Sequence, residues 1–543
     1  MTTTALRLFT PDGRHDLTVP ADEAGLPVSE LLARRGYPLN TRCGGHGRCG
    51  GCAVILRAGS LLRPGAGTRV TAGSPGSFPS CQLRLGAEPV ELAVPARSLL
   101  RHAPAVVAEF RLNIPWAHDP LIPAARYGAA VDLGTTTVAL LLCDLATGRV
   151  IGEASAFNAQ IRFGEDVLTR IQLCSTEPGA LARLQRAAAG ETINPLLAEA
   201  CRQARISPRD VGGMTVAGNT TMLHLLAGVD PTPMGVHPFQ PVFLEHRRYA
   251  PHDLGLDFGD GAAEVHLLPG PAAYVGADLA AGMVATGLLY DEGPALLVDV
   301  GTNGEIVAKV GDRLIGCATA AGPAFEGAGL TSGMRAVQGA IERVQLQTDP
   351  FAAELGVIGG AARPLGLCGS AYIDFLWEGR RRGLLQPSGR FTRAFCSGAG
   401  DAVQADADGR KLRLHPRGVS GPVWISERDV ARLLQAKAAI AAGIATLLKL
   451  LGTTPPAVKR LYLAGGFGLH LSLEHAIGCG LLPGFATGQI QVVGNTSLGG
   501  AFLALNDRSL LAEMADACRS MEAIELNLQP GFENAYIDNL LLP

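Results

Sequence analysis

Lysine and long apolar runs are the two features that this 543-residue sequence largely lacks. It contains five lysines and a formal net charge of −3, so its composition favours neither a nucleic acid nor an anionic membrane as a partner. No lysine follows a glycine, which excludes a P-loop. Charged residues interrupt residues 1–16, and we therefore expect no secretion signal. The most apolar stretch, residues 431–452, contains Arg432, Lys437 and Lys449 and predicts a core helix instead of a membrane span.

A disulfide framework is missing as well. Four of the twelve cysteines lie within residues 43–81, and the others are scattered over the rest of the chain. This distribution is typical of reduced thiols, and it predicts a cytoplasmic protein. The length indicates several domains.

Residues 42–52, RCGGHGRCGGC, carry two competing signatures. Gly45, Gly47 and Gly50 spell the dinucleotide-binding pattern G-x-G-x-x-G, which requires a strand before it and a helix after it. The flanks show the opposite order, because a helix-like segment precedes the glycines and the strand-like residues 52–59 follow them. The dinucleotide interpretation is therefore excluded.

The cysteines of the same stretch form the second signature. Three of them have the spacing C-x5-C-x2-C, close to the plant-type 2Fe–2S spacing, and a fourth follows at a distance. Four thiolates can also hold zinc, but structural zinc sites usually use two short knuckles with two ligands each. We therefore predict a 2Fe–2S cluster, with glycines that adopt positive φ to wrap it. The predicted ligands are Cys43, Cys49, Cys52 and Cys81. The surrounding strand and helix pattern resembles a β-grasp ferredoxin over residues 1–95.

Residues 96–126 are rich in proline, which disfavours long helices and central strands. We interpret this segment as a linker that is partly docked through apolar side chains. Its roughly 30 residues could reach about 100 Å when fully extended. The ferredoxin-type unit is therefore expected to be tethered and separable from the rest.

A repeat dominates the remaining sequence. Residues 129–157 and 295–323 each show an apolar strand, the pattern D-x-G-T, a second strand, a turn and a third strand. Asp132 and Asp299 are the matching acids. Two copies of one α/β module predict two lobes with a cleft between them.

The chemistry of this cleft follows from its turns. Backbone N–H groups and hydroxyls in a D-x-G-T turn can hold an anion such as phosphate. An aspartate at the end of a strand can hold magnesium-bound water or orient an attacking water. Either D-x-G-T alone could be an ordinary turn, but two in matching frames, together with the A-G-G turn at residues 464–466, predict a site for ATP with Mg²⁺.

The pattern resembles the superfamily of sugar kinases, heat-shock chaperones and actin (ASKHA), whose ATP lies between two ribonuclease-H-like lobes. The resemblance implies lobe I at 127–290 and lobe II at 291–543. It gives Asp132 and Asp299 the catalytic roles. It implies three nucleotide-binding segments, namely Gly134, Thr135 and Thr136, then Gly301, Thr302 and Asn303, and the adenosine segment Gly465, Gly466 and Phe467.

An ASKHA ATPase joined to a 2Fe–2S ferredoxin domain resembles the reductive activators of corrinoid proteins. AGNTTMLHLLAG and PAFEGAGLTSGMRAVQGAI are also similar to that family. The resemblance implies ATP-dependent transfer of one electron to Co(II), which regenerates Co(I) for methyl transfer. It implies two partners, a corrinoid protein of a methyltransferase system and an upstream electron donor. Some members carry a middle domain between linker and ATPase, for which residues 96–126 leave no room.

Other functions share parts of this pattern. A small-molecule kinase has the same cleft, but it needs no ferredoxin. Activators of 2-hydroxyacyl-CoA dehydratases bridge one 4Fe–4S cluster between two subunits, which differs from the four-cysteine set here. An ATP-switched redox sensor, or an activator of another metalloenzyme, stays open. So does the oligomeric state, with a homodimer as one option.

Overall fold

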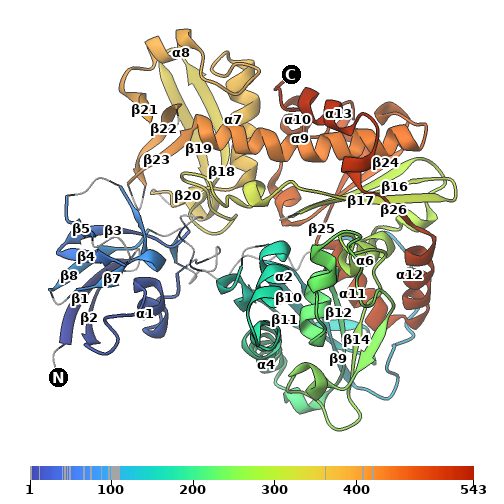
Figure 1. Cartoon of the computed structure of the whole chain (residues 1–543). Coiled ribbons are helices and arrows are strands. Elements are labelled where there is room, and N and C mark those ends of the chain that lie inside the picture. The colour runs from blue at the N-terminus through green and yellow to red at the C-terminus, as the bar shows by residue number, and fades with distance from the viewer. Residues whose placement is uncertain are drawn as a thin grey trace.

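The computed structural model covers residues 1–543. It describes all of them except 1–2, 11–12, 40, 42–44, 46, 48–50, 65–67, 74–75, 87, 96–97, 100–109, 165, 302, 361–362, 407–408 and 419–420. Figure 1 shows a small N-terminal unit beside two larger α/β lobes, as the predicted multidomain fold requires.

The N-terminal unit contains a five-stranded sheet with one packed helix. Strand β1 pairs antiparallel with β2 and parallel with β8, and β8 pairs antiparallel with β3. Alternate residues of β1, Leu6 and Leu8, are buried with Leu31 and Leu32 of the helix. This arrangement is the predicted β-grasp. The elements are β1 (Thr3–Thr10), β2 (Gly13–Pro20), α1 (Val28–Arg34), β3 (Ala53–Ala58), β6 (Phe78–Pro79) and β8 (Val90–Ala93), with a small second sheet of β4 (Ser60–Arg63), β5 (Thr68–Thr71) and β7 (Arg84–Leu85).

The first lobe is built on a six-stranded sheet of order β11-β10-β9-β12-β14-β13. Its strands are β9 (Tyr127–Leu133), β10 (Thr137–Asp144), β11 (Arg149–Phe157), β12 (Val211–Gly218), β13 (Arg247–Tyr249) and β14 (Glu264–Leu267). Its helices are α2 (Val167–Thr176), α3 (Ala180–Ala188), α4 (Asn194–Ala204), α5 (Thr220–Ala227) and α6 (Ala277–Thr286).

The second lobe repeats this plan with the order β25-β24-β15-β16-β17-β26. In both lobes three antiparallel strands follow one another, and the first of them pairs in parallel with a later strand. The predicted duplication is thereby confirmed. The strands are β15 (Ala295–Val300), β16 (Gly304–Val310), β17 (Arg313–Thr319), β24 (Arg460–Ala464), β25 (Ile490–Gly494) and β26 (Glu522–Ala523).

Two three-stranded sheets and several helices complete the second half of the chain. The strands are β18 (Ala340–Thr348), β19 (Phe351–Val357) and β20 (Gly366–Leu367), then β21 (Val403–Asp406), β22 (Gly409–Gly418) and β23 (Gly421–Ser426). The helices are α7 (Gly369–Arg381), α8 (Arg393–Gly398), α9 (Glu427–Leu450), α10 (Leu473–Gly478), α11 (Thr496–Asn506), α12 (Arg508–Ser520) and α13 (Phe532–Asp538).

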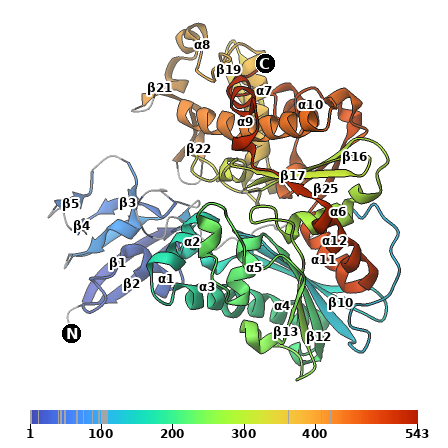
Figure 2. The ribbon, with the colours of Figure 1, turned by 45° about the vertical axis from the view of Figure 1, so that its right-hand side comes forward.

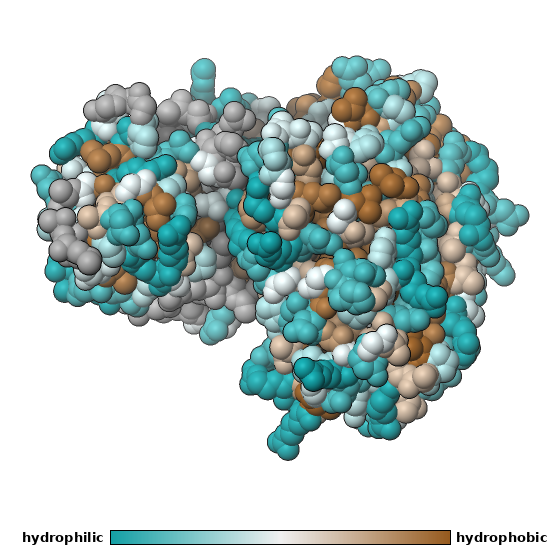
Figure 3. All heavy atoms as spheres, turned by 60° about the horizontal axis from the view of Figure 1, so that its bottom comes forward, coloured by the Kyte–Doolittle hydropathy of each residue, from teal (hydrophilic) through white to brown (hydrophobic). Residues whose placement is uncertain are grey.

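Helix α9 is the predicted core helix. It is long and apolar enough to cross a membrane, but 78% of its most apolar window is buried inside the protein. Lys437 in its middle is buried, and its Nζ donates to the carbonyl of Leu541 at 3.0 Å. Hydrophilic residues dominate the face shown in Figure 3, and the apolar residues there form small groups.

Helices α11 and α12 lie between β25 and β26 of the second lobe in sequence but pack into the core of the first lobe. Helices α6 and α11 lie side by side where the lobes meet (Figure 2). Their contact is close, because a Cβ on Gly500 would come within 2.2 Å of the carbonyl oxygen of Ala281. The predicted boundary at residue 290 thus separates the sequence repeats, whereas the packing crosses it.

Residues 110–126, which we call the strap, lie along α11. Phe110 and Trp116 both contact the ring of Phe502, at centroid distances of 5.9 and 5.7 Å. Backbone hydrogen bonds join the strap to both sides of the lobe junction, from Arg111 N to the Val493 carbonyl and from Asn113 N to the Ala285 carbonyl. The second half of the predicted linker is therefore docked on the two-lobed part of the chain.

Candidate functional site

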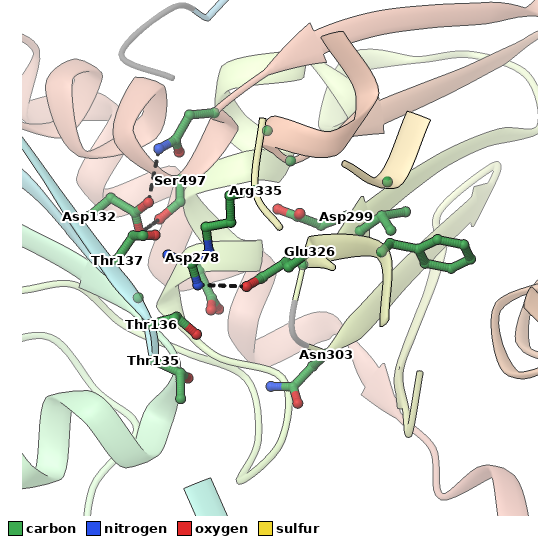
Figure 4. Close-up of a pocket in the computed structure, with 18 of the residues that line it drawn as sticks. Asp132, Thr135, Thr136, Thr137, Asp278, Asp299, Asn303, Glu326, Arg335 and Ser497 are labelled. Atoms are coloured by element: carbon green, nitrogen blue, oxygen red, sulfur yellow. Dashed lines mark hydrogen bonds and ion pairs between the residues drawn. The ribbon is translucent and has the colours of Figure 1, made fainter. Parts of the chain in front are cut away.

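Both D-x-G-T turns line one cavity of about 240 Å³ between the lobes (Figure 4). The first turn joins β9 to β10, and the second joins β15 to β16. The predicted residues that line this cavity are Asp132, Gly134, Thr135, Thr136, Asp299, Gly301, Asn303, Gly465 and Gly466. Thr302 and the side chain of Phe467 lie outside the described part of the chain.

The first aspartate is held by two neutral donors. Asn495 Nδ2 donates to Asp132 Oδ2 at 2.9 Å, and Ser497 Oγ donates to Asp132 Oδ1 at 2.7 Å. Both donors come from the start of α11, where Asn495 also caps the helix. Residues far apart in the sequence therefore orient this carboxylate.

The rest of the first turn is supported from behind. Asn158 Nδ2 donates to the Gly134 carbonyl at 2.9 Å, and the buried Arg170 donates to the Thr135 carbonyl at 2.6 Å. Asn219 Nδ2 donates to Thr135 Oγ1 at 2.9 Å. These bonds occupy turn carbonyls, so the turn presents its N–H and hydroxyl groups to the cavity, an arrangement suited to phosphate.

The second turn is backed by glycines. The N–H of Gly301 donates to the carbonyl of Asn303 at 2.9 Å, which closes the turn. Gly465 has φ +91°, and a Cβ there would lie 2.5 Å from the carbonyl oxygen of Val300 and 2.9 Å from Asp299 Oδ1. Only glycine fits at this position, and it brings the A-G-G turn against the second phosphate turn.

Four carboxyl groups meet in the cavity. Asp278, in the first turn of α6, and Glu305, at the start of β16, join the two predicted aspartates. Burial, followed by the charges of neighbouring carboxylates, raises the pKa of Asp299 to about 7. Burial also raises the pKa of Asp278 to about 7 and that of Glu305 well above its usual value. The pKa of Asp132 is raised by burial, against the opposing effect of its two hydrogen bonds.

A divalent cation would stabilise the charged form of these carboxylates. As the described side chains stand, no group of three or more Asp, Glu, His or Cys residues is arranged to hold a metal ion, so a cation here would need further ligands from outside the chain. Sequence reasoning missed Asp278 and Glu305. Glu305 could have been found from the sequence, because it stands directly after the second turn. Asp278 had no such signal, since acidic residues are ordinary in the first turn of a helix.

Glu326 and Arg335 lie on another side of the cavity. Their side chains form an ion pair with an Nη2–Oε2 distance of 2.8 Å. The guanidinium carbon also lies 4.7 Å from the ring centroid of Phe157, the last residue of β11 in the first lobe. Arg335 thus extends from the second lobe to the first. Its sequence run resembled a known family, but neither residue was singled out from the sequence.

The structure describes two of the four predicted cluster cysteines. Cys52 and Cys81 are both buried, and hydrogen bonding from Cys81 is the main cause that lowers the pKa of Cys52 to about 6. Cys43 and Cys49 lie outside the described residues. Among the residues that are described, no group of three or more potential ligands forms a metal site.

The loop around these cysteines has the expected backbone. Gly45 and Gly47 have φ values of +84° and +72°. Gln82 Nε2 donates to the Gly45 carbonyl and contacts Cys81 Sγ at 3.9 Å. A low-pKa buried thiol among amide donors fits a site for a thiolate-bound metal group.

Two family models match the ATPase part. The model described as the C-terminal domain of RACo, the ASKHA domain, matches residues 293–543. The model described as the RACo middle region matches residues 127–291. The second match covers the first lobe, which begins with β9 at Tyr127, directly after the linker.

Individual relatives cover most of the chain. The corrinoid activation enzyme RamQ of Eubacterium limosum is 29% identical over 95% of this chain and 96% of its own length. The [Co(II) methylated amine-specific corrinoid protein] reductase of Methanosarcina barkeri is 27% identical over 76% of each chain. A solved structure titled reductive activator for corrinoid, iron-sulfur protein matches with a TM-score of 0.71 at 28% identity, covering 99% of this chain and 98% of the other.

Proposed function

We propose that the chain is a member of the RACo family and an ATP-dependent reductive activator of a corrinoid protein. The observation that carries the proposal is the cavity between the lobes, where two phosphate-type turns face a cluster of buried carboxyl groups. Each catalytic cycle takes one electron from an upstream donor and delivers it to Co(II), which becomes Co(I).

The cavity residues divide the binding of ATP among them. The turns at Gly134–Thr136 and Gly301–Asn303 hold the phosphates through N–H and hydroxyl groups. The A-G-G turn at Gly465 contacts the nucleoside end. Asp278 and Asp299 would hold the hydrated magnesium ion, or would orient the water that attacks the terminal phosphate. ATP therefore contacts both lobes at once and favours their closed arrangement.

The N-terminal unit supplies the electron. Cys43, Cys49, Cys52 and Cys81 would hold a 2Fe–2S cluster, which carries one electron at a potential of roughly −400 mV in plant-type ferredoxins. The low pKa of Cys52 keeps that ligand in its thiolate form near neutral pH. The closed lobes grip the corrinoid protein, and hydrolysis then releases it.

Domain limits and location follow from the same proposal. We assign residues 1–95 to the cluster domain, 96–126 to the linker, 127–290 to lobe I and 291–543 to lobe II, with α11 and α12 returning to lobe I. No disulfide is formed among the described cysteines, which supports a location in the cytoplasm.

The proposed activity is tested by following the absorbance change from Co(II) to Co(I) in a set of candidate corrinoid proteins. Reduction should require the full chain, an electron donor and Mg·ATP together, and ATP hydrolysis should rise when the right corrinoid protein is present. ATP hydrolysis stimulated by a sugar or carboxylate, with transfer of phosphate to it, would overturn the proposal in favour of a kinase.

The cluster is tested separately by chemical analysis. Iron and acid-labile sulfide should each be about two per chain. Cys81→Ala should lose the cluster spectrum, whereas Cys174→Ala, on α2 of the first lobe, should keep it. Zinc in place of iron, or an unaltered spectrum in Cys81→Ala, would refute this assignment.

A further inference from the structure

Arg335 is the permanent cation among the described residues that line the ATP cavity. The acidic residues of the same lining are Asp132, Asp278, Asp299, Glu305 and Glu326. The cavity therefore repels anions unless cations offset these carboxylates. Magnesium can offset those near the two turns, but Arg335 is the one positive charge that the chain itself supplies there.

The guanidinium of Arg335 has one side occupied and one side open. Nη2 pairs with Glu326 at 2.8 Å, and the flat face lies over Phe157. Nη1 is buried and donates to no acceptor among the described residues. A buried charged donor without an acceptor is unfavourable, so this position indicates an acceptor that enters the cavity from outside the chain. Figure 4 shows Arg335 directed into the cavity, toward the first phosphate turn.

The backbone that carries Arg335 is firmly placed. Met334 N donates to the Leu367 carbonyl at 2.8 Å, and Val337 N donates to the Arg335 carbonyl at 2.9 Å. Gly327 packs so closely that a Cβ would lie 2.4 Å from Met334 N. The side chain therefore starts from a fixed point, and Glu326 and Phe157 hold its end.

Arg335 also connects the lobes next to the first turn. Phe157 precedes Asn158, whose backbone N–H donates to the Thr136 carbonyl at 2.9 Å. An anion that accepts a hydrogen bond from Nη1 would therefore lie near the first turn while it contacts Arg335 of the second lobe. Arginine binds phosphate with two parallel N–H groups, which a carboxylate-rich cavity otherwise lacks.

We propose that Arg335 binds the terminal phosphate of a nucleoside triphosphate, that Glu326 positions it, and that this contact makes the cleft close on ATP and not on ADP. The inference rests on the proposed function, and it names the side chain that distinguishes a nucleoside triphosphate from a diphosphate. Arg335 contacts the nucleotide directly, whereas Glu326 acts only through Arg335.

The test compares the affinities of the full chain for Mg·AMPPNP and Mg·ADP by calorimetry. Arg335→Ala should weaken binding of the triphosphate analogue about tenfold or more, as for loss of a charged hydrogen bond, and change ADP binding less than about twofold. The affinity of Arg335→Lys for the triphosphate analogue should lie between those of wild type and Arg335→Ala, because lysine keeps the positive charge but lacks the planar guanidinium. Arg343→Lys, exposed on β18, is the matched control.

The positioning role has its own variants. Glu326→Gln keeps an acceptor for Arg335 and should stay within about threefold of wild type, whereas Glu326→Ala should weaken triphosphate binding about fivefold. Hydrogen exchange at the end of β11 should slow with AMPPNP in wild type and not in Arg335→Ala. Equal losses for both nucleotides would reduce Arg335 to a structural role, and no loss would refute the proposal.

These outcomes separate the two proposals. If Arg335 distinguishes AMPPNP from ADP but no corrinoid protein is reduced by wild type, the inference stands and the proposed function fails. If corrinoid reduction proceeds and Arg335→Ala binds both nucleotides normally, the inference fails alone.

Discussion

The turns at the ends of β9 and β15 have the same sequence pattern, but their aspartates lie in different surroundings. Asp132 accepts hydrogen bonds from Asn495 and Ser497. Asp299 lies in a buried site close to other carboxyl groups, which raise its pKa further, and no hydrogen bond to its carboxylate is seen among the described residues. The repeat has kept the backbone and the acid while the neighbours have diverged.

This difference suggests a division of labour. The first aspartate is already oriented before ligands arrive, because neutral donors from α11 hold both of its oxygens. The second is stable as a charged group only when a cation joins it. We therefore expect the first turn to act as a preformed anchor and the second to respond to magnesium and nucleotide.

The largest effect is expected when Asp299 loses its charge. Asp299→Asn should bind ATP but hydrolyse it about 10²-fold more slowly or worse, as for other groups that position charge or water in a transition state. The cluster spectrum should be unchanged, and the variant should stay attached to the corrinoid protein longer. Single-turnover hydrolysis and equilibrium nucleotide binding measure the two effects separately.

Ser497→Ala tests the first aspartate in the same way. It removes one of the two hydrogen bonds that Asp132 accepts, and it should slow ATP hydrolysis about tenfold. Asp312→Asn, at the exposed turn between β16 and β17, is the neutral control. If Ser497→Ala were as damaging as Asp299→Asn, the proposed difference between the turns would be wrong.

A smaller effect is expected from pH. The pKa values of Asp278 and Asp299 are raised to about 7, so the folded, nucleotide-free chain binds more protons than the unfolded chain between about pH 4 and 7. Its stability should therefore fall as pH rises through this window. Magnesium must displace these protons, and Mg·nucleotide should bind more weakly at pH 6 than at pH 8 by about tenfold for each proton displaced.

Calorimetry in two buffers of different ionisation enthalpy counts the released protons. Magnesium-free nucleotide is the control, since its affinity should not rise with pH. Proton uptake on binding of Mg·nucleotide, or equal affinity at both pH values, would contradict the assignment of these carboxyl groups to the cation.

The smallest effect on catalysis is expected from the strap, because none of its residues lines the cavity. A fragment of residues 109–543 should melt like the ATPase part of the full chain. A fragment of residues 126–543 lacks Phe110 and Trp116, and it should melt about 5 °C lower and hydrolyse ATP a few-fold more slowly. Neither should reduce cobalt. Equal melting of the two fragments would show that the domain boundary lies at residue 126.

Much of the site could be predicted because its main residues stand at the ends of strands in a repeated pattern. The D-x-G-T turns and the A-G-G turn were found in this way, and all three line one cavity. The donors to Asp132 could not be found, since Asn495 and Ser497 join it only through the packing of α11 on the first lobe. Arg335 was equally hidden, because a single arginine in an irregular loop has no periodic signal.

The linker shows where composition was informative and where it was not. Its prolines disfavour long helices, and the described residues 110–126 contain none, but the prolines do not reveal which stretch is docked. That depended on the fit of Phe110 and Trp116 against Phe502, a tertiary contact without a local pattern.

The docked strap also sets the effective concentration of the N-terminal unit, which we propose as the direct electron donor to cobalt. The last described pairing of the N-terminal unit is at Leu99, and the strap begins at Phe110. The chain between them can span at most about 40 Å, far less than the roughly 100 Å available to the whole linker. A group confined to that distance is present at about millimolar concentration beside the lobes. A free ferredoxin at micromolar concentration would compete poorly with it, so we expect the covalent connection to favour the proposed cluster of the N-terminal unit as the one that meets the cobalt.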